Sequence, residues 1–215
     1  SRICELTGAD VEQVAHGMGV DKRIGHAFLR AGLGYGGSCF PKDVDAFVRM
    51  GDDLGYSLDL LKEVQKINLS QREHLMRKLL EELWVVEDKQ IAIYGLSFKP
   101  GTDDIRESPA LYFVSELLAR KAKLKLWDPI GRQKFQQVHP DLDYCDDLLE
   151  CASGADALLI LTDWPQIKEI DLEKLKKSMK HPIIVDGRNT FDPSKMAEKG
   201  LVYHCIGRKT GGKTV

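Results

Sequence analysis

The sequence predicts an α/β protein: an all-helical region over residues 1–86, then a doubly wound parallel-sheet domain over 87–207. In the first region, apolar residues recur at helical spacing, most clearly along 58–84. In the second, short apolar runs alternate with helical segments, which is typical of a parallel sheet covered on both faces. These runs are 90–94, 122–127, 157–161 and 182–186, with a last candidate at 201–203. The small, basic and polar stretch 208–215 is predicted to be a flexible tail.

Composition narrows the class of protein. The chain has 215 residues, and its 43% hydrophobic and 30% charged content is ordinary for a globular protein with a core. A net charge of -2 argues against a general nucleic-acid binder. The five cysteines form no CxxC pair and the six histidines are scattered, which favours reduced thiols and no metal site. Without an apolar run of membrane-spanning length or a signal-peptide layout, we expect a cytoplasmic chain with no membrane segment.

Two helices are predicted at the beginning of the chain. Asp10 is a suitable N-cap for a helix that carries apolar residues from Val11 to Met18. Asp21 is taken as the cap of a second helix that runs to about Arg30. The long helix over 58–84 is apolar enough to need partners on more than one side. Burial within the domain and contact with a second subunit are both open on this pattern.

In the second region, helices are expected from Pro109 onward and near 146–153 and 171–179. Ligands of doubly wound sheets bind beyond the carboxyl ends of the strands. The segments that follow the predicted strands therefore form the expected edge for a ligand. They are 95–106, 128–129, 162–164 and 186–188.

A glycine-rich stretch over 30–43 contains the most distinctive residues of the first region. Glycines let a ligand approach the main chain closely, and Pro41 suits the first turn of a helix over 43–50. Cys39 would then precede a helix N-terminus, where the dipole favours the nucleophilic thiolate. Asp43 would lie about one turn away. The alternative is that Cys39 is simply a small buried hydrophobic residue.

Three blocks of sequence carry a resemblance to a known family. GYGGSCFPKDV over 34–44 resembles the active-site loop of the nucleotide-sugar dehydrogenases, and specifically of those that act on UDP-glucose. GLSFKPGTDDIRESP over 95–109 is similar to the nucleotide-handling segment of that family, and DGRN over 186–189 recurs in the right order. The resemblance implies a Rossmann-like UDP-sugar-binding domain over 87–207 and a central dimerisation domain over 1–86.

The resemblance also implies the chemistry. These enzymes use two NAD⁺ to oxidise the C6 alcohol of UDP-glucose to the carboxylate of UDP-glucuronate. Cys39 would add to the intermediate aldehyde as a thiohemiacetal, which is oxidised to a thioester. Water would then hydrolyse the thioester, with Asp43 as the base or as the group that positions the water.

Further residues receive binding roles from the resemblance. Arg23 would reach a substrate phosphate in the neighbouring subunit, although a solvated helix charge is an equal alternative. The sugar would be enclosed by residues of the cysteine loop and the segment before it, namely Phe28, Leu29, Tyr35 and Gly36.

In the second region, Phe98 and Lys99 would contact the UDP-sugar, and Arg106 would reach the phosphates of NAD. Arg188 would contact substrate phosphate. From the residues alone, the favoured interpretation is that Lys99 and Arg106 form surface ion pairs. For Arg188, the alternative to a phosphate contact is a capping salt bridge to Asp186.

The fingerprint of dinucleotide-binding domains is a G-x-G-x-x-G loop directly after a strand. It is not found here, because the glycines with this spacing, at 32–37, follow no predicted strand. We therefore expect a C-terminal fragment that transfers no hydride by itself and that dimerises through the helix over 58–84. The sequence of the cysteine loop favours UDP-glucose as the substrate, while GDP-mannose and UDP-N-acetylhexosamines remain alternative substrates. A non-catalytic nucleotide-binding and dimerisation module is the alternative of a different class.

Overall fold

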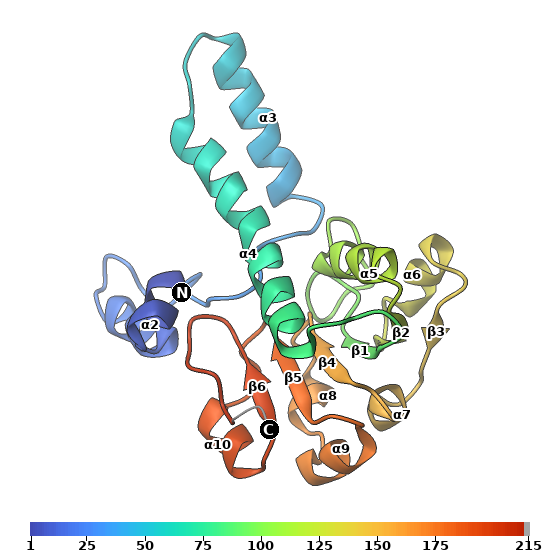
Figure 1. The fold of residues 1–215 in the computed structure, drawn as a ribbon. Helices are drawn as coiled ribbons and strands as arrows, with labels where there is room; N and C mark the ends of the chain where they lie inside the picture. Colours follow the sequence, from blue (N-terminus) through green and yellow to red (C-terminus); the bar gives the residue numbers. More distant parts are fainter. Residues whose placement is uncertain (213–215) are drawn as a thin grey trace.

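A computed structural model describes residues 1–212 and confirms the predicted α/β architecture (Figure 1). Its first part is helical, and its second part is a parallel sheet with helices on both faces. The helices of the first part are α1 (Arg2–Thr7), α2 (Val11–Gly19), α3 (Phe40–Asp53) and α4 (Asp59–Leu83). None of the helices among residues 1–212 combines the length and apolar character that a membrane span requires.

The sheet contains six parallel strands in the order β3-β2-β1-β4-β5-β6, the strand order of dinucleotide-binding Rossmann sheets. The strands are β1 (Gln90–Tyr94), β2 (Lys123–Trp127), β3 (Asp143–Tyr144), β4 (Ala157–Ile160), β5 (Ile183–Asp186) and β6 (Val202–His204). β1, β4 and β5 are almost wholly buried because helices cover both faces of the sheet. This burial explains why the sequences of such parallel strands are nearly continuous apolar runs.

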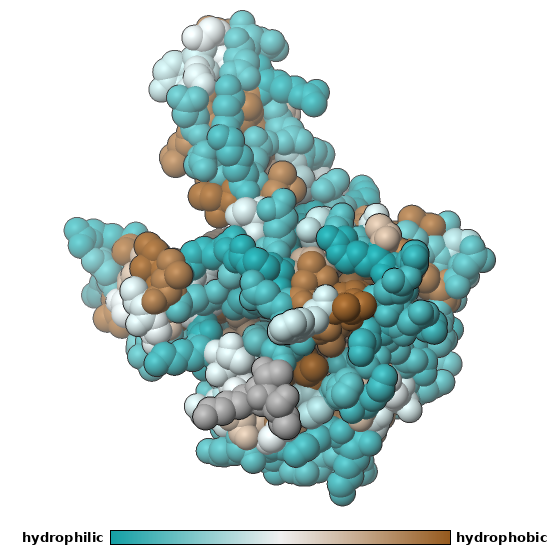
Figure 2. All heavy atoms as spheres, in the orientation of Figure 1, coloured by the Kyte–Doolittle hydropathy of each residue, from teal (hydrophilic) through white to brown (hydrophobic). Residues whose placement is uncertain are grey.

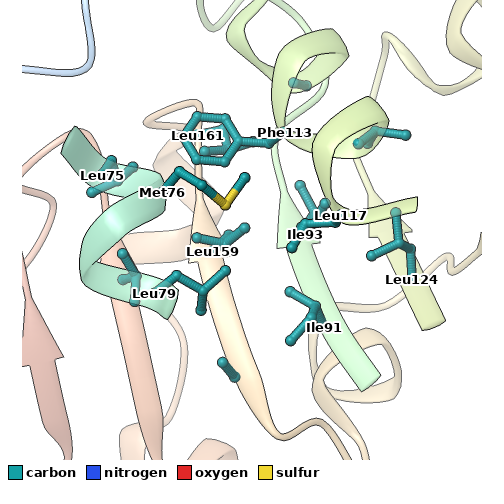
Figure 3. Packing of buried hydrophobic residues seen from close by; sticks show 14 of the residues in the cluster. Leu75, Met76, Leu79, Ile91, Ile93, Phe113, Leu117, Leu124, Leu159 and Leu161 are labelled. Carbon is teal, nitrogen blue, oxygen red and sulfur yellow. The ribbon is translucent and has the colours of Figure 1, made fainter. Parts of the chain in front are cut away.

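Two apolar clusters fill the two faces of the sheet. The helices around it are α5 (Pro109–Ala119), α6 (Arg132–Val138), α7 (Leu148–Ala152), α8 (Pro165–Lys168), α9 (Leu172–Ser178) and α10 (Pro193–Glu198). Helices α7 to α10 contribute to the cluster on one face. On the other face, α5 packs beside the C-terminal half of α4, whose Leu75, Met76 and Leu79 are buried (Figure 3).

Helix α4 therefore belongs to both parts of the molecule. Its C-terminal half covers the sheet, while its N-terminal half forms a hairpin with α3 that projects from the body (Figure 1). Gly51, in the last turn of α3, packs against the segment that connects the two helices, and a Cβ there would lie 2.7 Å from the carbonyl oxygen of Tyr56. The predicted long helix over 58–84 is confirmed, and its burial against the sheet was one of the two possibilities left open.

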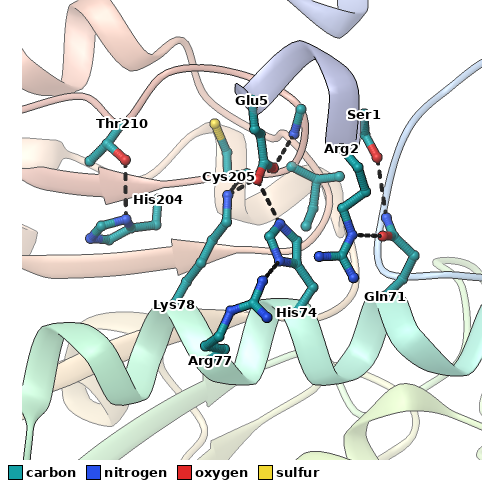
Figure 4. Close-up of polar contacts among 12 residues, drawn as sticks. Ser1, Arg2, Glu5, Gln71, His74, Arg77, Lys78, His204, Cys205 and Thr210 are labelled. Atoms are coloured by element: carbon teal, nitrogen blue, oxygen red, sulfur yellow. Dashed lines mark hydrogen bonds and ion pairs between the residues drawn. The ribbon is translucent and has the colours of Figure 1, made fainter. Parts of the chain in front are cut away.

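A polar network fixes α1 to this framework (Figure 4). The Glu5 carboxylate lies 2.6 Å from Nε2 of His74, and it accepts hydrogen bonds from Lys78 Nζ at 2.8 Å and from the Gly207 amide at 2.7 Å. His74 and Lys78 lie on α4, and Gly207 follows β6. The network thus joins the first helix, the shared helix and the last strand.

The predicted helix from Asp21 to Arg30 is wrong. Residues 21–27 form turns, with the Asp21 carboxylate accepting hydrogen bonds from the Arg23 amide and guanidinium. Gly25 and Phe28 have positive φ values of 72° and 64°, which an α-helix does not accommodate. Asp at a chain turn binds its own backbone as readily as it caps a helix, and this ambiguity misled the sequence interpretation.

The sequence interpretation also omitted the short elements β3, α6, α8 and α10. Within the predicted tail over 208–215, Arg208 pairs with Asp10 and Asp192, and Gly211 bridges to Tyr203. Specific contacts therefore continue to at least Gly211. The remainder of that prediction, 213–215, lies outside the described residues, and the domain boundaries stay predictions.

Candidate active site

A pocket of about 840 Å³ lies where the segment before α3 crosses α4 and the carboxyl edge of the sheet. Phe98 and Lys99 reach it from the loop after β1, Asp163 from the loop after β4, and Arg188 from the loop after β5. The sequence placed ligands at this edge. Six predicted site residues line the pocket: Phe28, Tyr35, Gly36, Phe98, Lys99 and Arg188.

Cys39 is the N-cap residue of α3, which is the helix-entry position that the sequence predicted, and it is exposed. Its carbonyl accepts the Asp43 amide at 3.0 Å, so Asp43 lies one helical turn further on. The side chain of Asp43 forms an ion pair with Lys42, whose pKa is raised by that hydrogen bond. The alternative of Cys39 as a small buried residue is therefore wrong, whereas the four other cysteines are buried.

Glycines allow the cysteine loop to lie directly on the loop after β1. A Cβ on Gly36 would lie 2.2 Å from the carbonyl oxygen of Glu107, and one on Gly37 would lie 2.6 Å from the Phe98 ring. Gly37 also has a φ of 84° and donates its amide to the Arg106 carbonyl at 3.1 Å. The sequence indicated close backbone approach here, and the structure shows which backbone approaches.

Arg188 crosses the floor of the pocket. Its Nε donates to the Leu161 carbonyl at 2.8 Å and its Nη2 to the Phe98 carbonyl at 3.2 Å. Only its backbone amide bonds to the Asp186 carboxylate, so the anticipated capping salt bridge is absent from the described residues. Burial lowers the pKa of Arg188, and Asp163 and Asp186 counteract this.

Positive charge gathers around the same floor. Arg30 and Arg72 both lie close enough to Arg188 to lower its pKa further. Arg30 pairs with Asp163 at 3.5 Å, and the Lys99 ammonium lies 5.3 Å from the centroid of the Phe98 ring. Arginine and lysine in a partly enclosed site are well suited to phosphate oxygens. The pocket therefore offers apolar walls together with a cationic floor.

Five of the predicted site residues do not line this pocket: Arg23, Leu29, Cys39, Asp43 and Arg106. Cys39 and Asp43 adjoin it through Phe40 and Val44, which do line it. Arg106 is exposed and held by Asp104; that hydrogen bond raises the pKa of Arg106, with a smaller contribution from Cys39. Arg23 is exposed and paired with Asp21, and its contact with a substrate phosphate in the neighbouring subunit stays a prediction.

Sequence reasoning missed Arg30, Asn68, Gln71 and Asp163 as lining residues. Asn68 and Gln71 belong to α4, where their polar side chains resembled ordinary exposed helix positions. Asp163 could have been found, because it falls in the strand-end segment 162–164 that was expected to meet a ligand. Among residues 1–212, no cluster of three His, Cys, Asp or Glu side chains could hold a metal ion.

Two protein-family profiles match this chain. The profile described as "UDP-glucose/GDP-mannose dehydrogenase family, central domain" matches residues 1–70, and that of the family's UDP binding domain matches 92–193. The chain belongs to the UDP-glucose/GDP-mannose dehydrogenase family. The pocket lies between the two matched regions, since its lining comes from both.

Curated relatives within this family include a UDP-glucose 6-dehydrogenase of Bacillus subtilis (YwqF), 45% identical over 97% of this chain. Another is the UDP-glucose 6-dehydrogenase of Pseudomonas aeruginosa, 41% identical over 98% of this chain. The alignments cover 48% of each relative. The chain thus spans about half the length of the curated relatives that it matches.

Solved structures agree with the fold. A UDP-glucose dehydrogenase from Pyrobaculum islandicum is 33% identical with a TM-score of 0.86, covering 96% of this chain and 46% of that one. A UDP-D-ManNAc dehydrogenase from Pyrococcus horikoshii is 29% identical with a TM-score of 0.80 and the same coverage. Because both are similar to this chain, fold alone does not distinguish the sugar.

Proposed function

We propose that this chain forms the cysteine-loop and UDP-sugar-binding part of an NAD-dependent UDP-glucose 6-dehydrogenase, which produces UDP-glucuronate. The observation that carries the proposal is the pocket, where a cationic floor and apolar walls adjoin the helix entry that presents Cys39. Pockets of this size accept ligands as large as a sugar nucleotide. The 45% identity to a UDP-glucose 6-dehydrogenase supports the choice of substrate.

In this proposal, the diphosphate lies near Lys99 and Arg188, and the sugar extends toward Cys39. The Cys39 thiolate attacks the aldehyde carbon of the half-oxidised sugar and forms a tetrahedral thiohemiacetal. Such an adduct gives up a hydride more readily than a planar aldehyde does. The resulting thioester is hydrolysed by water that Asp43 positions or deprotonates, which requires Asp43 to exchange its ion pair with Lys42.

NAD would accept the two hydrides when bound. The described residues fit one contact with it: the Arg106 guanidinium is 71% exposed and is fixed on one side by Asp104, which leaves N–H groups for a phosphate. No strand of residues 1–212 is followed by a G-x-G-x-x-G loop; the glycines with that spacing, at 32–37, lie in the cysteine loop before β1. We therefore propose that the 215-residue chain alone produces no NADH from UDP-glucose.

We also propose a homodimer through the α3–α4 hairpin. Figure 2 shows apolar residues among the hydrophilic ones on this projecting hairpin. Leu60, Ile67 and Leu69 on α4 are 79%, 56% and 58% exposed, and Phe47 and Met50 on α3 are about half exposed. Such an exposed apolar surface is typical of a subunit interface. Because the N-terminal half of α4 does not cover the sheet, it is available for contact with a second subunit.

Thermal melting of the purified chain with UDP-glucose, UDP and GDP-mannose tests the proposed substrate class. A ligand at a hundredfold excess over its Kd stabilises the folded state by about 2.7 kcal/mol, which raises Tm by about 5 to 10 °C at this chain length. We expect the rise with both UDP compounds and not with GDP-mannose. K99M should reduce it, whereas K168M, an exposed lysine on α8, should not. An equal rise with GDP-mannose would contradict the assignment to UDP-sugars.

A further inference from the structure

Arg72 on α4 is a buried cation. The residue is only 8% exposed, and no carboxylate among residues 1–212 lies within ion-pair distance of its guanidinium. Its Nε has no hydrogen-bond partner within that range. Burial lowers the pKa of Arg72, and the more distant Glu107 carboxylate only partly counteracts this. Burying a guanidinium without a counter-charge costs free energy, so its remaining contacts indicate what it does.

Those contacts join two loops. Nη2 of Arg72 lies 3.4 Å from the carbonyl oxygen of Tyr35 and 3.4 Å from that of Glu107. Tyr35 belongs to the loop that leads to Cys39, and Glu107 follows Arg106 in the loop after β1. One nitrogen therefore bridges the segment that carries the thiol and the segment that carries the exposed arginine.

Asn68, one turn earlier on α4, provides a contrast. It accepts the Tyr35 amide at 2.7 Å and donates to the Tyr35 carbonyl at 3.0 Å. No hydrogen bond of Asn68 within residues 1–212 reaches the loop after β1. Asn68 holds only the cysteine loop, whereas Arg72 holds both loops.

The second loop needs such support. Glu107 has a φ of 52°, a left-handed conformation that costs a residue with a side chain roughly 1 kcal/mol or more. Its carbonyl oxygen lies against Gly36, at the place where a Cβ could not fit. A charged donor on that carbonyl offsets part of the cost.

We propose that Arg72 is a positioning residue that couples the Cys39 loop to the Arg106 loop through the carbonyls of Tyr35 and Glu107. The two loops then move as one unit, and the thiol keeps a fixed distance from Arg106. The inference rests on the proposed function only in taking Cys39 as the nucleophile and Arg106 as a phosphate contact.

Amide hydrogen exchange on the purified chain, without ligand, tests the coupling. We expect R72M to accelerate exchange about fivefold or more in both loops, 33–39 and 104–108, whereas N68A accelerates it only in 33–39. R77M removes an exposed arginine from the same helix and should change neither loop. Faster exchange in R72M that is confined to 33–39, or spread evenly over the chain, would overturn the proposal.

R72K covers the case in which R72M does not fold. Lysine keeps the charge, but its ammonium does not reproduce the planar guanidinium, so we expect both loops to exchange faster in R72K as well. Wild-type protection of both loops in R72K would refute the bridging role. Because no ligand is present, this result does not depend on whether UDP compounds bind, and failure of the proposed function would appear only in the melting experiment.

Discussion

Gly187, just after β5, offers a direct test of how the cysteine segment is anchored to the sheet. Its carbonyl accepts the Leu33 amide at 3.1 Å. A Cβ at this position would lie 1.8 Å from Cδ2 of Leu33 and 2.9 Å from Cδ2 of Leu75, and both leucines are fully buried. The substitution G187A therefore places a methyl group inside the contact between segment 32–34, α4 and the sheet.

Ordinary carbon contacts lie at about 3.5 to 4 Å, so Leu33 must move by about 2 Å or the segment must rise. Overpacking of this kind costs about 1 to 3 kcal/mol. At this chain length the loss corresponds to a Tm decrease of about 2 to 12 °C. Because the conflict is mainly with one side chain, shortening Leu33 should relieve it.

Denaturant unfolding of G187A, L33A and the double variant measures the coupling. L33A alone should cost about 2 to 5 kcal/mol, and the double variant should cost less than the sum by at least about 0.5 kcal/mol. G17A is the matched control, because a Cβ there meets nothing within 4 Å and Gly17 lies in α2. It should stabilise the chain by about 0.5 to 1 kcal/mol. Strict additivity, or an unchanged stability of G187A, would refute the packing argument.

Three further predictions concern acid stability, thiol reactivity and assembly. Burial alone would raise the pKa of Glu5, but hydrogen bonds from His74, Lys78 and Gly207 outweigh it and lower the pKa from 4.5 to about 2. The stabilisation is thus complete above about pH 4.5 and lost as pH falls toward 2, so wild type should lose about 2 to 3 kcal/mol more than E5Q over this range in acid unfolding curves. Equal losses would exclude the network as the cause. A thiol reagent should modify one cysteine rapidly in the native chain and none in C39S, because the four others are buried; several fast thiols in C39S would contradict the burial. The variant L60D should change a dimer to a monomer in light scattering, whereas V138D, an exposed apolar position on α6, should not; a persisting L60D dimer would exclude the hairpin interface.

Much of the sheet domain could be predicted because its strands are buried on both faces. The segments 91–94 and 183–185 are apolar throughout, and Pro109 begins a helix where the sequence indicated it. The thiol at a helix entry was also predictable, since glycine, proline and an apolar helical pattern agree there. β3 was not, because two residues in a polar stretch give no periodicity.

The contacts between distant segments could not be predicted from local pattern. Asn68 and Arg72 resemble ordinary polar positions of a long helix, and only the fold brings them to Tyr35. Gly187 resembled part of a nucleotide-binding motif, yet the described contacts show that it makes room for Leu33. Such roles depend on backbone approach between elements, which residue spacing along the chain does not encode.

The pocket is proposed to bind a UDP-sugar with its sugar within reach of Cys39. Alkylation of Cys39 is therefore measured in the presence and absence of UDP-glucose, with C39S as the blank and GDP-mannose as the competing ligand. We expect saturating UDP-glucose to slow the alkylation at least about tenfold and GDP-mannose to leave it unchanged. Unchanged alkylation at a UDP-glucose concentration that raises Tm would place the sugar away from the thiol and exclude Cys39 as the nucleophile.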